Sequence, residues 1–141
     1  MNNHVIFGDS HSWKHWKLIR ESVDIEPPSP KNISIKVPGR DGELDLTEFI
    51  TGRTCYENRR ITFVFHTAEC LSKMAWTALM SRILNEIHGR KLHITLEEDA
   101  EYFYVGRCAV DKFQSSRTLS TVTITCDCEP YKYKADGTKG L

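Results

Sequence analysis

Hydrophobic and polar residues alternate with a period of two along several parts of the chain. In one run the odd positions are Ile61, Phe63 and Phe65, and a longer run at 102–110 has apolar residues on both faces. The other runs lie at residues 33–37, 92–97 and 121–128. Residues two apart share one face of a strand, so each run predicts a β-strand with a buried face. Most of the chain is therefore predicted to be sheet.

A helical spacing replaces this alternation between Thr67 and Gly89. Apolar residues recur there at Trp76, Leu79, Met80, Ile83 and Ile87. This stripe predicts one amphipathic α-helix, over about residues 70–88, which lies along the sheet and covers its apolar face. Thr67 or Ser72 is expected to cap its start, and the sequence does not choose between them. Gly89 is placed to end the helix in a left-handed conformation.

Turn-forming residues separate the predicted strands. Residues 38–42 read Pro-Gly-Arg-Asp-Gly, and residues 98–101 link two strands in a predicted hairpin. The proline-rich residues 27–31 predict a stiff, extended connector. The polar residues 135–141 predict a flexible tail. We therefore expect one domain over residues 1–134, of mainly β (α+β) class, followed by that tail.

Composition narrows the class of protein. The 141 residues are 40% hydrophobic and 27% charged, as in a single globular domain. Nineteen basic and 19 acidic residues give no net charge, and so no general electrostatic reason to bind nucleic acid or anionic lipid. No apolar run approaches the roughly 20 residues that span a bilayer. The N-terminus has no signal-peptide pattern, so we expect folding in a cytoplasm and no membrane anchor.

The five cysteines do not have the spacing of a disulfide framework. Cys126 and Cys128 alternate with Thr125 and Asp127 in a predicted strand, where a free cysteine acts as a small buried apolar residue. A lone C-x-C pair is a weak zinc signal, because structural zinc usually draws on two such pairs. We predict neither a metal site nor a cofactor.

The sharpest catalytic motif is a short apolar strand that runs into Gly8, Asp9 and Ser10. It looks like the nucleophile block of the GDSL hydrolases, in which that serine attacks an ester. The family's D-x-x-H base and G-x-N oxyanion donor are missing from this sequence, and its last histidine is His93. A serine esterase is therefore only an alternative, and we predict that the protein is not an enzyme.

Other polar groups are weaker candidates. His11 and His15 have helical spacing but no third metal ligand, which favours a surface or packing role. The acidic residues at 97–101 are interpreted as a solvated turn rather than a calcium site. A small basic and aromatic group falls short of a nucleic-acid-binding surface: Arg53, Tyr56, Arg59 and Arg60. With no convincing active site, the residues favour a binding or assembly role.

The order of the short motifs says more than any one of them. FGDSHSWKHWKLI is followed by PPSPK, VPGRDGELDLTE, YENRRITFVF, a W-x-x-L-x-S-x-I-x-N-x-I-H-G helix and strands that end in CDCEPYKYK. This series, from about residue 4 to residue 134, resembles the N-terminal domain of siphophage distal tail proteins. The resemblance implies a β-sandwich or split barrel of antiparallel strands, with one covering helix and a protruding hairpin.

The same resemblance implies a structural function. Distal tail proteins form a hexameric ring that joins the tail tube to the tail-tip hub or baseplate and leaves a central channel for DNA. The implied partners are further copies of the chain, a tail tube protein and a hub protein, with DNA only as passing cargo. The implied location is the virion tail tip of a phage or prophage, after assembly in the bacterial host cytoplasm. Another tail ring, such as a tube or terminator subunit, is the alternative within this class.

Ring assembly suggests where contacts lie. Exposed edge strands invite pairing with another chain, and a cyclic ring uses heterologous contacts. We expect subunit or tube contacts at Pro38, Gly39, Arg40, Asp41, Gly42, Tyr56, Arg59 and Arg60. Arg40, Asp41 and Arg59 are expected either to form ion pairs between subunits or to stabilise their own turns, and the sequence weights these equally.

Overall fold

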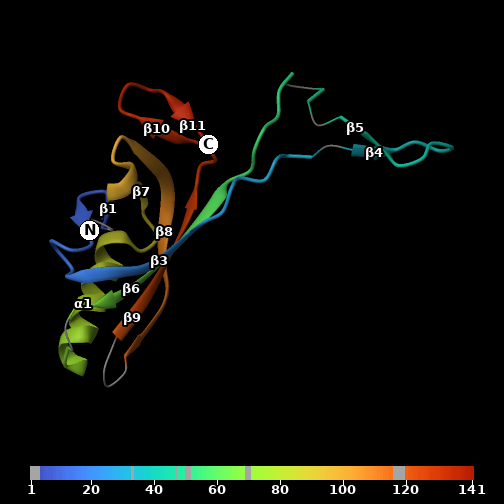
Figure 1. Ribbon diagram of the computed structural model, residues 1–141. Helices are drawn as coiled ribbons and strands as arrows, with labels where there is room; N and C mark the ends of the chain where they lie inside the picture. The colour runs from blue at the N-terminus through green and yellow to red at the C-terminus, as the bar shows by residue number, and fades with distance from the viewer. Residues whose placement is uncertain (1–3, 33, 47, 50–51, 69–70, 116–119) are drawn as a thin grey trace.

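The computed structural model describes residues 4–32, 34–46, 48–49, 52–68, 71–115 and 120–141 (Figure 1). Antiparallel strands and one α-helix follow one another in the order β1 (Val5–Phe7), β2 (Ser10–His11), β3 (Leu18–Ile25), β4 (Ser34–Lys36), β5 (Glu43–Asp45), β6 (Arg59–Thr67), α1 (Lys73–Ile87), β7 (Lys91–Leu96), the 3₁₀ turn η1 (Glu97–Asp99), β8 (Tyr102–Ser115), β9 (Ser120–Cys128), β10 (Lys132–Lys134) and β11 (Lys139–Gly140). The predicted mainly β class is confirmed.

The main sheet has the strand order β2-β1-β7-β8-β9-β6-β3, and β10 pairs with the start of β8. Its two ends meet. The Leu18 amide at the start of β3 donates to the Ser12 carbonyl at 2.9 Å, and the Ser12 amide donates to the Val5 carbonyl at 2.9 Å. Phe7 of β1 also lies 5.4 Å from Phe63 of β6, ring centre to ring centre, across the core. The sheet is therefore bent round on itself into the sandwich-like form that was predicted.

Period-two alternation places the core on the inner face of this sheet. Ile61, Phe63 and Phe65 are fully buried, and so are the alternate residues 122, 124, 126 and 128 of β9. The register sets β6 beside β9, with Phe63 opposite Ile124. Burying each such side chain stabilises the fold by roughly 1.5–3 kcal/mol. These strands are formed and aligned by the burial of one face.

The helix covers the open side of the bent sheet, and its inward stripe is Trp76, Met80, Ile83 and Ile87. Its cap is Ser72, whose hydroxyl accepts from the Ala75 amide at 3.2 Å, whereas Thr67 is the last residue of β6. The helix is therefore shorter than the predicted 70–88. It ends as predicted before Gly89, which has a φ of 77° that a side chain disfavours.

Residues 26–58, here called the arm, leave the body between β3 and β6 and include the small β4–β5 hairpin (Figure 1). At the other end of the chain, β11 pairs with β10. The flexibility predicted for residues 135–141 and the domain boundary at 134 stay predictions. Within the described residues, none of the helices has the length and apolar character that crossing a bilayer requires.

Candidate assembly surface

The tip of the arm is the predicted turn at residues 38–42. β4 and β5 pair with Ile35 opposite Leu44, and the Arg40 amide donates to the Val37 carbonyl at 3.2 Å. Gly39 and Gly42 have φ values of 79° and 72°, which explains why glycine occupies both of these positions in the turn. All five tip residues are exposed. Neither Arg40 nor Asp41 forms an ion pair with another described residue, so a local pair does not hold this turn.

The arm also exposes large apolar side chains. Phe49 is 79% exposed, Ile35 47% and Val37 36%. A two-stranded hairpin without a covered face is only marginally stable in water. A side chain as exposed as that of Phe49 contributes nothing to the hydrophobic core of the chain. The arm therefore carries apolar side chains that no described part of the chain covers.

The root of the arm is anchored by backbone pairing and by aromatic contact. The Lys31 amide donates to the Cys55 carbonyl at 2.7 Å, and Pro30 bridges to Tyr56. The half-buried Tyr56 ring meets Tyr131 edge to face, with 6.1 Å between ring centres. Tyr56 therefore fixes the arm to the segment before β10. A contact of Tyr56 with another subunit stays a prediction.

Arg59 and Arg60 start β6 and point to opposite faces. Arg59 is only 6% exposed, and its guanidinium donates to three backbone carbonyls at 3.0–3.4 Å: those of Glu26, Pro130 and Leu141. It ties the arm root to the C-terminal strands. Arg60 is exposed on the outer face, opposite Asp127 in register. Of the eight predicted contact residues, the structure thus groups five at the tip and three at the root, and does not bring the two groups together.

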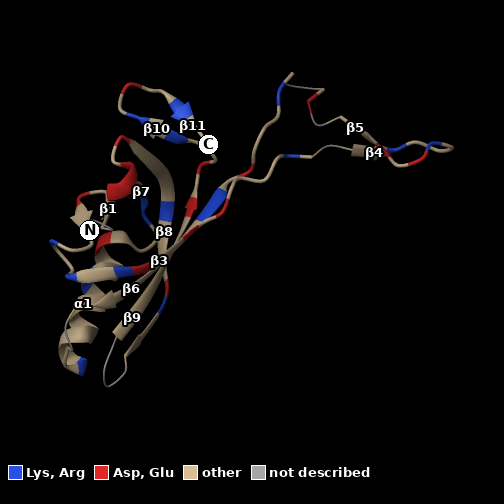
Figure 2. Cartoon of the chain, viewed as in Figure 1, with Lys and Arg blue, Asp and Glu red and all other residues tan. Residues whose placement is uncertain are grey.

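The acidic turn between β7 and β8 is more than a solvated turn. Figure 2 shows η1 in red and much of β10 and β11 in blue. Three of its carboxylates pair with a cation from another segment: Glu98 with Arg20 at 2.7 Å, Asp99 with Lys132 at 2.6 Å and Glu101 with Lys134 at 3.7 Å. The fourth, Glu97, accepts from the His11 ring at 3.0 Å. The turn therefore joins the N-terminal loop, β3 and β10. Among the described residues, no cluster of three or more His, Cys, Asp or Glu residues could hold a metal ion.

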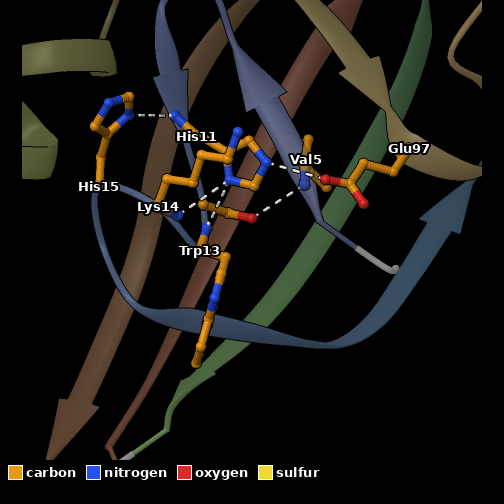
Figure 3. A network of polar contacts seen from close by, with 7 residues as sticks. Val5, His11, Trp13, Lys14, His15 and Glu97 are labelled. Carbon is orange, nitrogen blue, oxygen red and sulfur yellow. Dashed lines mark hydrogen bonds and ion pairs between the residues drawn. The ribbon is translucent and has the colours of Figure 1, made fainter. Parts of the chain in front are cut away.

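The histidines of the N-terminal loop have a packing role (Figure 3). His11 Nδ1 accepts from the amides of Trp13 and Lys14, both at 3.1 Å, so the ring proton lies on Nε2 and is donated to Glu97. His15 Nδ1 accepts from the His11 amide at 2.8 Å. Both rings therefore accept hydrogen bonds from backbone amides of a tight loop, in agreement with the predicted packing role.

Ser10 lies in β2, just after the turn that follows β1, and not on a strand-to-helix turn. Its hydroxyl donates to Glu86 of α1 at 3.1 Å, and Trp16 Nε1 donates to the same oxygen at 2.8 Å. Burial acts to raise the pKa of Glu86, but the donors Trp16, Ser10 and Arg82 outweigh it and hold the pKa below the usual value. Ser10, Glu86 and His15 line one surface hollow, but His15 Nδ1 accepts a hydrogen bond from the His11 amide. Ser10 thus has the contacts of a packing residue.

No protein-family model matches the sequence, and no curated protein matches it. Among solved structures, the chain is similar to the SPP1 Dit protein, described as a paradigm of the hub adsorption apparatus of phages that infect Gram-positive bacteria. The TM-score is 0.76 at 13% identity, over 95% of this chain and 53% of that one. This chain has a Dit-like fold.

The Dit fold accounts for nearly the whole chain, which spans about half the length of SPP1 Dit. At this identity the likeness establishes the architecture and leaves the function to be argued from the surfaces. The sequence alone could not show which of the predicted contact residues are exposed, because their exposure depends on how the arm projects from the body of the protein. The exposure of Phe49 could not be predicted either, because one phenylalanine in a polar stretch carries no period.

Proposed function

We propose that the protein is a structural component of a phage or prophage tail tip, a distal tail protein that forms a hexameric ring between the tail tube and the hub or baseplate. The observation that carries the proposal is the Dit fold over 95% of the chain. The order of motifs from FGDS to EPYKYK supports it independently. Assembly takes place in the bacterial host cytoplasm, and the ring leaves a channel through which DNA passes. A neutral chain suits this passage, because clustered arginines would hold the phosphates.

The arm is the proposed contact between neighbouring subunits or with the tube. Its tip residues Pro38–Gly42 and its apolar residues Ile35 and Phe49 are exposed, and no element of the described chain covers them. An element that projects from one face and is received by a different face gives a heterologous contact, which closes into a ring when the rotation permits. The root residues Tyr56, Arg59 and Arg60 then set the angle at which the arm leaves the body.

Light scattering combined with negative-stain imaging tests the proposal. We expect rings with an open centre and a mass six times that of the 16.3 kDa chain. The chain is also to be mixed with its tail tube and hub proteins, since a ring can require a template to close. A monomer that binds neither protein contradicts the proposal. Labelling of Ser10 by a fluorophosphonate probe, lost in Ser10→Ala, would favour the esterase instead.

A pair of matched substitutions tests the arm itself. Phe49→Ser removes a side chain on the arm that is 79% exposed, and Met74→Ser removes one on α1 that is 83% exposed. Neither is part of the core, so both variants should unfold like the wild type. If Phe49 is buried between subunits, its loss weakens each contact by about 1.5–3 kcal/mol, roughly ten- to a hundredfold in affinity. Met74→Ser should assemble normally, and equal behaviour of the two variants would refute the arm contact.

A further inference from the structure

Three buried thiols lie together on the inner face of β8 and β9. Cys108, Cys126 and Cys128 are each fully buried. In the register of the two strands Cys108 is directly opposite Cys126, and their sulfur atoms are 3.4 Å apart. All three cysteines are free thiols. Two sulfur atoms at this distance are in van der Waals contact with nothing between them.

The backbone fixes which kind of cross-strand pair Cys108 and Cys126 form. The Cys108 amide donates to the Arg90 carbonyl at 2.9 Å, and the Cys108 carbonyl accepts from the Gly89 amide at 2.7 Å. Both polar groups therefore point toward the β7 side and away from β9. The Cys108–Cys126 pair in the β8–β9 ladder is thus of the non-hydrogen-bonded kind, in which the Cα atoms are about 4.5 Å apart and the side chains are closest. Disulfides span Cα distances of about 4.4–6.8 Å, so this pair fits without movement of the strands.

The third thiol, that of Cys128, is not placed to form a disulfide with Cys108. Cys128 is directly opposite Gly106, and a Cβ at Gly106 would lie 2.5 Å from the Cys128 sulfur, so the thiol fills the space above the glycine. Cys128 is a diagonal neighbour of Cys108. Diagonal pairs across a ladder are about 7–8 Å apart, which is too long for a disulfide. Cys128 therefore serves as a matched control.

We propose that Cys108 and Cys126 are a disulfide site, kept as two thiols in a reducing cytoplasm and closed to a cross-strand disulfide in a non-reducing medium. The oxidant is a low-molecular-weight disulfide such as oxidised glutathione. One cysteine, as its thiolate, attacks that disulfide and releases one thiol; the second then displaces the other, so two protons leave the cysteines and two small thiols form. Under the proposed function, the bond forms when the virion leaves the host cell.

The surroundings of the pair make the reaction dependent on opening of the strands. The hydrogen bond with Cys108, together with burial, raises the pKa of the Cys126 thiol, and burial raises the pKa of Cys128 to about 12. The Cys126 and Cys128 thiols are therefore protonated and inert while β8 and β9 stay paired. Oxidation proceeds through transient separation of β8 and β9, and the bond then holds the two strands together.

Intact mass and peptide mapping of the full chain test this site. The chain is incubated folded, with oxidised glutathione or with dithiothreitol, and its fold is checked by circular dichroism. We expect the oxidised sample to lose two hydrogen atoms, about 2 Da, to yield one linked peptide pair containing residues 108 and 126, and to melt roughly 5–10 °C higher. Neither the mass nor the peptide map depends on ring formation, so this result is separate from that of the proposed function.

Serine variants decide the pairing. Cys108→Ser and Cys126→Ser should each abolish the mass loss, whereas Cys128→Ser and Cys55→Ser should keep it. Because a buried serine can impair folding, the peptide map of the wild-type chain is decisive by itself. The inference is overturned if the folded wild type keeps its full mass, gains a glutathione adduct at either position, or links any other pair of cysteines.

Discussion

Glu86 is the residue whose loss should reveal most about how the N-terminal loop is held on the helix. Its carboxylate accepts from Trp16 Nε1 at 2.8 Å, from Ser10 at 3.1 Å and from Arg82 at 3.2 Å. Ser10 and Arg82 are partly exposed and can turn to water when Glu86 is removed. Trp16 is 2% exposed, so in Glu86→Ala its N–H stays buried without an acceptor.

An unsatisfied buried donor costs about 1–3 kcal/mol, and we expect Glu86→Ala to lower the free energy of unfolding by about 2 kcal/mol. For a chain of this size that is a fall in melting temperature of about 8 °C. Glu101→Ala is the control, because the Glu101 carboxylate is 82% exposed and pairs with Lys134 at 3.7 Å. An exposed pair of this kind contributes about 0–1 kcal/mol.

A double-mutant cycle isolates the contact between Glu86 and Trp16. Trp16→Phe keeps most of the apolar ring and removes the N–H, so Glu86→Ala should cost about 1–2 kcal/mol less in that background. Urea unfolding followed by far-ultraviolet circular dichroism measures all four proteins without relying on tryptophan fluorescence. If Glu86→Ala costs the same in both backgrounds, or no more than Glu101→Ala, the buried-donor argument is wrong.

Three further outcomes follow from the same contacts. The pKa of Glu86 is lowered in the folded state, so its contribution to stability is present above the unfolded value of 4.5 and is lost as the pH falls through the folded pKa. The stability difference between wild type and Glu86→Gln should therefore shrink in acid. A constant difference between pH 3 and pH 7 would count against this linkage. Gly106→Ala should destabilise the protein by more than about 2 kcal/mol in urea unfolding, because its Cβ would lie 2.7 Å from the Asp127 carbonyl and closer still to Cys128; wild-type stability would contradict this packing. Ser72→Ala should cost about 1 kcal/mol by loss of the helix cap, while Thr77→Ala, within the helix, should cost less.

The sheet and the helix could be predicted because burial repeats with a period. Residues 61–67 and 120–128 alternate without a break, and each became a central strand with one face in the core. The helical stripe was equally clear, but its start was not. Thr67 and Ser72 both have a side chain that can cap a helix, and only the register of β6 assigns Thr67 to the strand.

β3 shows where this kind of prediction stops. Residues 18–25 form an edge strand, but the register shifts between Arg20 and Ser22, so the buried positions change parity within the strand. A pattern search with a fixed period of two therefore misses it. Charges behave similarly: the acidic turn at 97–101 looks solvated in sequence, because its partners His11, Arg20, Lys132 and Lys134 come from distant segments.

Ser10 and the tip of the arm differ in whether contacts within the chain account for their side chains. Ser10 belongs to a tripeptide that suggested an esterase, and its hydroxyl is explained by one partner, Glu86, which lies 76 positions away. The arm is the reverse case, since the side chains of Arg40 and Asp41 form no ion pair with another described residue. The proposed function assigns these two residues to a contact with another subunit. Charge reversal of Arg40 alone should then weaken assembly, and reversal of both Arg40 and Asp41 should restore it only if the two residues face each other across neighbouring copies.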